Sequence, residues 1–236
     1  MLNHPVHAAP KFRMSKQLSA QLTAATLQRP YFFVHIPKCG GTSVGDALKG
    51  RYLHGRAVQW REKVGAEYWA GLNTFSMVRH PYERACSLFR YSVAIGELPP
   101  EMKGISLNDW VLDSFSGRNP KDLDLHLTYH PCAPWVVDED GKPLVDLICR
   151  LEEIEQDWKT IQDFTETEAE LTIKNKTVPS DGTRVEDLSD RSCALLNWYY
   201  AEDFENFGYG RRGEPRLKPR DEAPMVGRLS RQKGAN

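Results

Sequence analysis

The sequence predicts one α/β domain with a central parallel sheet and helices on both faces. Three short runs rich in β-branched, aromatic and aliphatic residues, at 31–36, 74–78 and 144–152, are each followed by apolar residues at helical spacing. This alternation of strand and helix is typical of a parallel sheet that holds its ligand at the carboxyl ends of the strands. The 236 residues can bury one good hydrophobic core. We therefore expect a single domain at 30–210, with a sheet of roughly four or five strands.

The first strand leads into a turn that is suited to anion binding. The run at 31–36 ends at Pro37, because proline cannot donate to a sheet ladder. Two glycines then let the backbone turn, and a helix is predicted from Thr42 onward, with Thr42 or Ser43 able to cap its first turn. Such a strand–turn–helix unit aims backbone N–H groups and the positive end of a helix dipole at one point. It predicts a receptor for phosphate or sulfate.

The position of the lysine in this turn narrows the ligand. Nucleotide triphosphatases place a lysine after the glycines, as GxxxxGK[ST], whereas Lys38 precedes them and the next lysine is Lys49. The run HIPKCGGTS, at 35–43, closely resembles the 5′-phosphosulfate loop of sulfotransferases that use PAPS (3′-phosphoadenosine 5′-phosphosulfate). The resemblance implies that PAPS is the cofactor and is bound by Pro37, Lys38, Cys39, Gly40, Gly41, Thr42 and Ser43.

The second predicted strand leads into another phosphate element. Arg79 stands at the end of this strand, and Pro81 suits the first turn of a helix predicted at 82–93. The run VRHPYERACSLFRY, at 78–91, resembles the 3′-phosphate element of sulfotransferases. The resemblance implies that Arg79 and Ser87 hold the 3′-phosphate of PAPS. Arginine makes a forked, charge-assisted contact with phosphate, and the serine hydroxyl adds one donor.

The remaining elements are weaker in pattern. Apolar spacing predicts helices at 57–71, 153–164 and 187–207, and Ser106 begins a capping-box-like sequence ahead of another helix. The sequence from Asp138 to Gly141 predicts a hairpin turn before the third strand.

Two further stretches extend the resemblance over most of the predicted domain. DEDGKPLVDLICRLEEIEQDW, at 138–158, and YYAEDFENFGY, at 199–209, are similar to the middle and the end of the family 2, carbohydrate-type sulfotransferases. The run KNKT, at 174–177, resembles the element that precedes the last helix of that family. The resemblance implies a P-loop-like nucleotide-binding fold of the sulfotransferase type.

The resemblance also implies a mechanism. In-line sulfuryl transfer to a hydroxyl of a carbohydrate or other small acceptor depends on positioning and charge stabilisation. Lys38 is expected to stabilise charge on the oxygen that the sulfuryl group leaves. Family members use a histidine general base, and matching backward through REKVGAEYW, at 61–69, places it at His54. His126 and His130 are rivals as base or substrate-contact residues. This chemistry requires no metal.

Composition excludes several other classes of protein. The net charge of −1 gives no global basic field, which argues against nucleic acid as a partner. Five cysteines without a CxxC pair favour reduced thiols and a cytoplasmic location. No apolar stretch approaches the ~18 residues that a membrane span requires, so we expect a soluble protein. Animal members of the family that the chain resembles generally carry a membrane anchor, so we expect either a bacterial-type cytoplasmic protein or a chain from which the anchor was trimmed.

The two ends are expected to lie outside the folded domain, and two other functions stay open. Residues 1–29 predict a flexible arm, and 211–236 predict a basic, proline-containing tail that is disordered in part. One alternative is a nucleotide kinase or other ATP-dependent phosphotransferase, which would need magnesium and a lysine after the glycines. The other is a non-catalytic, sulfotransferase-like module that binds the product nucleotide without turnover.

Overall fold

The computed structural model describes residues 30–50, 53–96, 98, 100–121, 127–172 and 183–229. The predicted arm at 1–29, the candidate His126 and the run at 174–177 lie outside the described residues. Within the described ranges, no helix is long and apolar enough to cross a membrane.

A four-stranded, mostly parallel sheet forms the centre of the fold. Its strands lie in the order β1 (Tyr31–Val34), β2 (Asn73–Val78), β3 (Leu147–Arg150) and β4 (Gly227–Arg228). The first three are parallel and nearly all of their residues are buried, which explains their continuous apolar sequences. The α/β class with a sheet flanked by helices is confirmed. The predicted parallel arrangement holds for the first three strands, and the sheet is mostly parallel, because β4 pairs antiparallel with β3.

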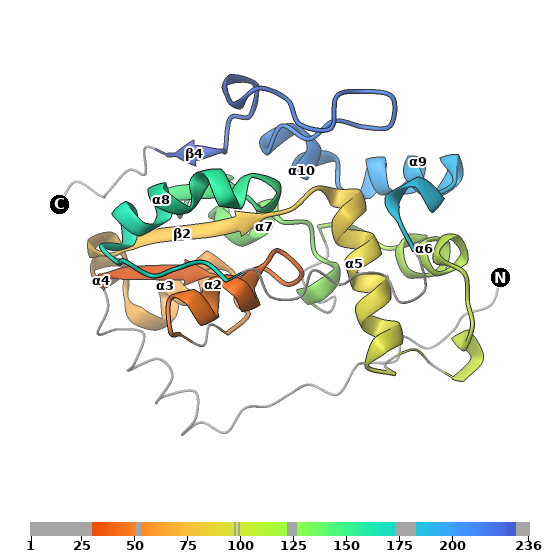
Figure 1. Ribbon diagram of the computed structural model, residues 1–236, viewed down its shortest axis with the longest axis horizontal. Helices are drawn as coiled ribbons and strands as arrows, with labels where there is room; N and C mark the ends of the chain where they lie inside the picture. The colour runs from red at the N-terminus through yellow and green to blue at the C-terminus, as the bar shows by residue number, and fades with distance from the viewer. Residues whose placement is uncertain are drawn as a thin grey trace.

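Helices flank this sheet. Figure 1 shows α8 on one side of β2 and α2 with α3 on the other, while α5, α6 and α9 gather beyond the end at which β2 stops. The α-helices are α2 (Gly41–Ala47), α3 (Ala57–Val64), α4 (Ala66–Gly71), α5 (Pro81–Ala94), α6 (Leu107–Phe115), α7 (Ala133–Val136), α8 (Ile154–Thr165), α9 (Asp190–Tyr199) and α10 (Ala201–Asn206). Short 3-10 helices are η1 (Pro100–Met102), η2 (Leu127–Tyr129), η3 (Leu151–Glu153), η4 (Val185–Asp187) and η5 (Arg220–Glu222).

Two predicted helices are divided. The helix expected at 57–71 breaks at Gly65, whose φ of 93° favours glycine, into α3 and α4. The helix expected at 187–207 begins instead at Asp190, behind Ser189, whose hydroxyl accepts from the N–H of Ser192. It is interrupted at Tyr200, where α9 gives way to α10. Apolar spacing does not reveal these breaks, because both halves of each pair bury apolar side chains.

Part of the predicted tail is folded. Residues 208–218, which we name the C-terminal hairpin, form an antiparallel bridge between Tyr209 and Leu217. Arg150, which is buried at the end of β3, donates from Nη1 to the carbonyl of Lys218 at 3.0 Å. The chain then continues to β4 at the sheet edge. The segment 211–229 is therefore packed on the domain.

Candidate functional site

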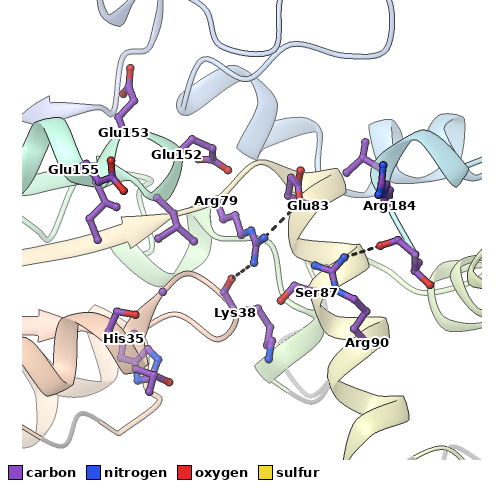
Figure 2. Close-up of a pocket in the computed structure, with 18 of the residues that line it drawn as sticks. His35, Lys38, Arg79, Glu83, Ser87, Arg90, Glu152, Glu153, Glu155 and Arg184 are labelled. Carbon is purple, nitrogen blue, oxygen red and sulfur yellow. Dashed lines mark hydrogen bonds and ion pairs between the residues drawn. The ribbon is translucent and has the colours of Figure 1, made fainter. Parts of the chain in front are cut away.

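A cavity of ≈ 790 Å³ lies at the carboxyl ends of the three parallel strands. Its lining comes from four segments: 35–43 after β1, 79–90 at and after the end of β2, 151–156 after β3, and 183–186 before α9. Figure 2 shows the basic and acidic side chains of these segments around the same space. The two predicted nucleotide elements therefore line one cavity.

Two glycines fix the shape of the loop after β1. A Cβ atom on Gly41 would lie 1.8 Å from Nε2 of His35, and one on Gly40 would lie 2.5 Å from Cδ1 of Leu151. Gly40 also has a φ of 79° and is the N-cap of α2 without a side-chain hydrogen bond. The expected capping by Thr42 or Ser43 is therefore wrong, because the left-handed turn at Gly40 starts the helix.

Lys38 carries its charge in a strongly basic environment. Its backbone has a positive φ of 67°, and its Nζ lies 3.8 Å from the centroid of the Tyr91 ring. Burial, together with the neighbouring Arg79 and Arg90, lowers the pKa of Lys38 to about 8. Because Arg79 and Arg90 lie close enough to disfavour the charged form of Lys38, this part of the cavity is locally positive and is suited to an anion.

Arg79 joins the two predicted nucleotide elements. Its Nη1 donates to the carbonyl of Lys38 at 3.4 Å, and its Nη2 donates to Oε2 of Glu83 at 3.4 Å. Both hydrogen bonds are long and therefore weak, so a ligand can compete for the guanidinium of Arg79. Ser87 and Arg90 follow on α5 and line the same cavity, as Figure 2 shows. Lys38, Arg79 and Ser87 are thus brought together as the sequence predicted.

Arg84 is a structural residue to which the sequence assigned no role. Although its side chain is charged, it is only 1 % exposed. It donates to three backbone carbonyls: Pro37 at 3.1 Å, His130 at 2.7 Å and Thr128 at 3.1 Å. The available signal was its spacing of four residues from the buried Leu88, which puts both side chains on one helix face. Arg84 fixes the loop at 35–43 to α5.

Arg90 is the second residue of α5 that the sequence left without a role. Its Nη1 donates to the carbonyl of Thr183 at 2.9 Å, which links α5 to the segment at 183–186. Its Nε is buried and has no hydrogen-bond partner within the described residues. A guanidinium that lines the cavity close to Lys38 and keeps an unused donor is suited to bind an anionic ligand.

Neither of the two described candidate histidines, His54 and His130, lines the cavity. His54 is exposed and does not line the cavity, but its ring packs edge-on against His35 with centroids 4.5 Å apart, and His35 does line the cavity. His130 is 1 % exposed and also lies outside the lining, while its carbonyl accepts from Arg84. The predicted substrate contact of His130 gains no support from this placement.

Cys39 has a partner that its sequence position did not reveal. Its Sγ lies 3.8 Å from Sγ of Cys132, and both residues are buried. The backbone N–H groups of Cys132 and Ala133 donate to the two carboxylate oxygens of Asp203, at 2.7 and 2.8 Å. Burial raises the pKa of Asp203 to about 6, against the lowering effect of these hydrogen bonds and of Arg84. The five cysteines are all free thiols, as predicted.

The cavity is also lined by four carboxylates, which we name its acidic side and to which the sequence assigned no role. They belong to Glu152, Glu153, Glu155 and Glu186. Glu152 accepts from the backbone N–H of His80 at 2.9 Å and from the hydroxyl of Tyr209 at 3.1 Å. Despite this abundance of carboxylates, no group of His, Cys, Asp and Glu residues in the described ranges is arranged to hold a metal ion.

The arrangement can bind a ligand that carries two separated anionic groups. One would lie at Lys38 and the glycine turn, and the other between Arg79, Ser87 and Arg90. Comparisons with protein families, with curated proteins and with solved structures found no match to this chain.

Proposed function

We propose that the protein is a PAPS-dependent sulfotransferase that moves the sulfuryl group to a hydroxyl of a carbohydrate or other small acceptor. One observation carries the proposal. The loop that resembles the 5′-phosphosulfate element and the helix that resembles the 3′-phosphate element line one cavity, and Arg79 donates to the carbonyl of Lys38 across their junction. Loops that follow adjacent parallel strands meet at one edge of a sheet in any fold of this class, so the support lies in the residue types that meet there: Lys38 with the glycine turn, and Arg79 with Ser87.

The residues present fit PAPS as a cofactor. The cavity has the size of a nucleotide site, and the glycine turn leaves no room for side chains where the backbone would approach a phosphate. Lys38 and the loop would hold the 5′-phosphosulfate, and Arg79 with Ser87 would hold the 3′-phosphate. When bound, PAPS supplies an activated sulfuryl group. Lys38 then stabilises negative charge on the oxygen from which that group departs.

The acceptor hydroxyl must lose a proton, and His54 is the proposed base. Histidine is the side chain best suited to this work near neutral pH. The ring of His54 reaches the cavity only through His35, which lies between it and the glycine turn. An acceptor that enters along His35 would bring its hydroxyl to His54. The same placement favours a second candidate function, a non-catalytic module that binds the product nucleotide.

Calorimetric titration with 3′,5′-ADP (PAP), using 5′-AMP and ATP as controls, tests the proposal. We expect PAP to bind better than 5′-AMP. A charged phosphate contact contributes roughly 1.5 to 3 kcal/mol, so Arg79→Ala should weaken PAP binding at least about tenfold. Lys159→Ala, which removes an exposed cation paired with Asp163, is the matched control.

Three other results would contradict the proposal or favour another function. Equal affinity for PAP and 5′-AMP would contradict the proposal, because the 3′-phosphate would then contribute nothing to binding. Selective, magnesium-dependent binding of ATP would indicate a nucleotide kinase or another phosphotransferase. Binding of PAP without turnover of PAPS, together with indifference to His54→Ala, would indicate the non-catalytic module.

A further inference from the structure

The nucleotide cavity contains a carboxylate at the place where the 3′-phosphate would bind. Glu83 lines the cavity one helical turn after Arg79, and its Oε2 accepts from Nη2 of Arg79. An uncompensated carboxylate here would act against the ligand in two ways. It would repel the phosphate, and it would compete for the guanidinium that should bind it.

A second arginine compensates this charge from a distant part of the chain. Arg216 donates from Nη2 to Oε1 of Glu83, which leaves Oε2 to Arg79. The two oxygens of Glu83 are thus divided between two arginines. Because Arg79 holds only one oxygen, through one long bond, its guanidinium keeps donors for a phosphate.

The hairpin that carries Arg216 is fixed at the start of α5. Within it, the N–H of Gly210 donates to the carbonyl of Arg216 at 3.0 Å, and a Cβ atom on Gly210 would lie 1.7 Å from the carbonyl oxygen of Pro215. Nε2 of His80 lies 3.1 Å from the carbonyl of Gly210. His80 accepts the N–H of Tyr82 at Nδ1, so its Nε2 carries the proton and donates to Gly210. The hairpin therefore docks beside Arg79.

We propose that Arg216 is a positioning residue for the 3′-phosphate site, which neutralises Glu83 so that Arg79 is available to the ligand. This inference rests on the proposed sulfotransferase function. The side chain of Arg216 is 56 % exposed, so its ion pair contributes little to the stability of the fold. Its removal should therefore affect binding of the 3′-phosphate more than folding.

Titrations of PAP and 5′-AMP against four proteins test this role: the wild type, Arg216→Gln, Glu83→Gln and the double variant. We expect Arg216→Gln to weaken PAP binding about threefold to tenfold and to leave 5′-AMP binding unchanged, since the freed Glu83 engages Arg79 and faces only the 3′-phosphate. In the double variant the loss should disappear, to within about twofold of Glu83→Gln alone. Arg216→Lys, which keeps the charge, should recover part of the affinity.

Arg211→Gln is the matched control, because it removes a cation from the same hairpin that pairs with Glu205 instead of Glu83. It should leave the ratio of PAP to 5′-AMP affinity unchanged. If the wild type prefers PAP and Arg216→Gln keeps that preference, the role of Arg216 is refuted while the proposed function stands. A loss that persists in the double variant would also refute it, because the effect would then not act through Glu83. If the wild type does not prefer PAP, both proposals fall.

Discussion

The two sides of the cavity differ in how firmly their charges are held. On the acidic side, two of the four carboxylates are committed to the fold: Glu152 receives two donors, and Glu153 pairs with Arg150 and Arg220. On the basic side, Arg79 makes two long bonds, and Lys38 lies over an aromatic ring. Charges that are satisfied within the protein build the site, whereas charges that are loosely held are left for a ligand.

Removal of Lys38 should have the largest effect. Lys38→Met keeps much of the side-chain volume but removes the charge that would act on the departing oxygen. We expect turnover of PAPS, followed as release of PAP in the presence of mixed carbohydrate acceptors, to fall about 10²- to 10³-fold. Lys159→Met serves as the exposed control. Equal turnover by Lys38→Met and the wild type would show that the basic side has no catalytic role.

Arg84 is a basic residue near the cavity whose hydrogen bonds are all made within the protein. Its replacement should therefore affect stability, in contrast to replacement of Arg79. Replacement by methionine leaves three backbone carbonyls without their donor, so the free energy of unfolding should fall by about 2 to 4 kcal/mol. Urea denaturation measures this loss. Arg84→Lys should not restore stability, since one ammonium group cannot replace the forked guanidinium. Arg79→Ala, by contrast, should change stability by less than about 0.5 kcal/mol.

The sequence could predict the basic side because its information is local. Local sequence is enough to place these residues at the cavity. The glycines next to Lys38 form the turn after one strand, and Arg79 stands at the end of another. The acidic side could not be predicted, because it forms only when 151–156 and 183–186 converge. For the same reason, the proposal for Arg216 depends on a contact across 133 residues.

Other differences also arise from tertiary structure. The residues of the C-terminal hairpin are rich in arginine and glycine, so composition alone predicted a tail. Its order comes from partners elsewhere, such as His80 and Arg150, that the local pattern does not contain. The burial of Arg84 is similar, because its three acceptors lie in other segments of the chain.

The pH dependence of PAP binding should report the charge of Lys38. The 3′-phosphate is already fully ionised above pH 7, because its second pKa is about 6. With the pKa of Lys38 lowered to about 8, the free protein binds at full strength below that pH and must take up a proton to bind above it. PAP affinity should therefore fall about fivefold between pH 8 and pH 9. The decrease should be absent in Lys38→Met, and its persistence there would assign it to another group.

The smallest effect is expected on the acidic side. Glu152→Gln keeps one carbonyl oxygen but cannot accept from both His80 and Tyr209 as the carboxylate does, so stability should fall by about 1 kcal/mol. Affinity for PAP should stay within about twofold of the wild type, because the charge that is removed was already satisfied by the protein. Urea denaturation and calorimetry on the same variant separate the two effects. If PAP affinity changed as much as in Arg79→Ala, Glu152 would have to face the ligand, and the acidic side would be part of the binding surface instead of its support.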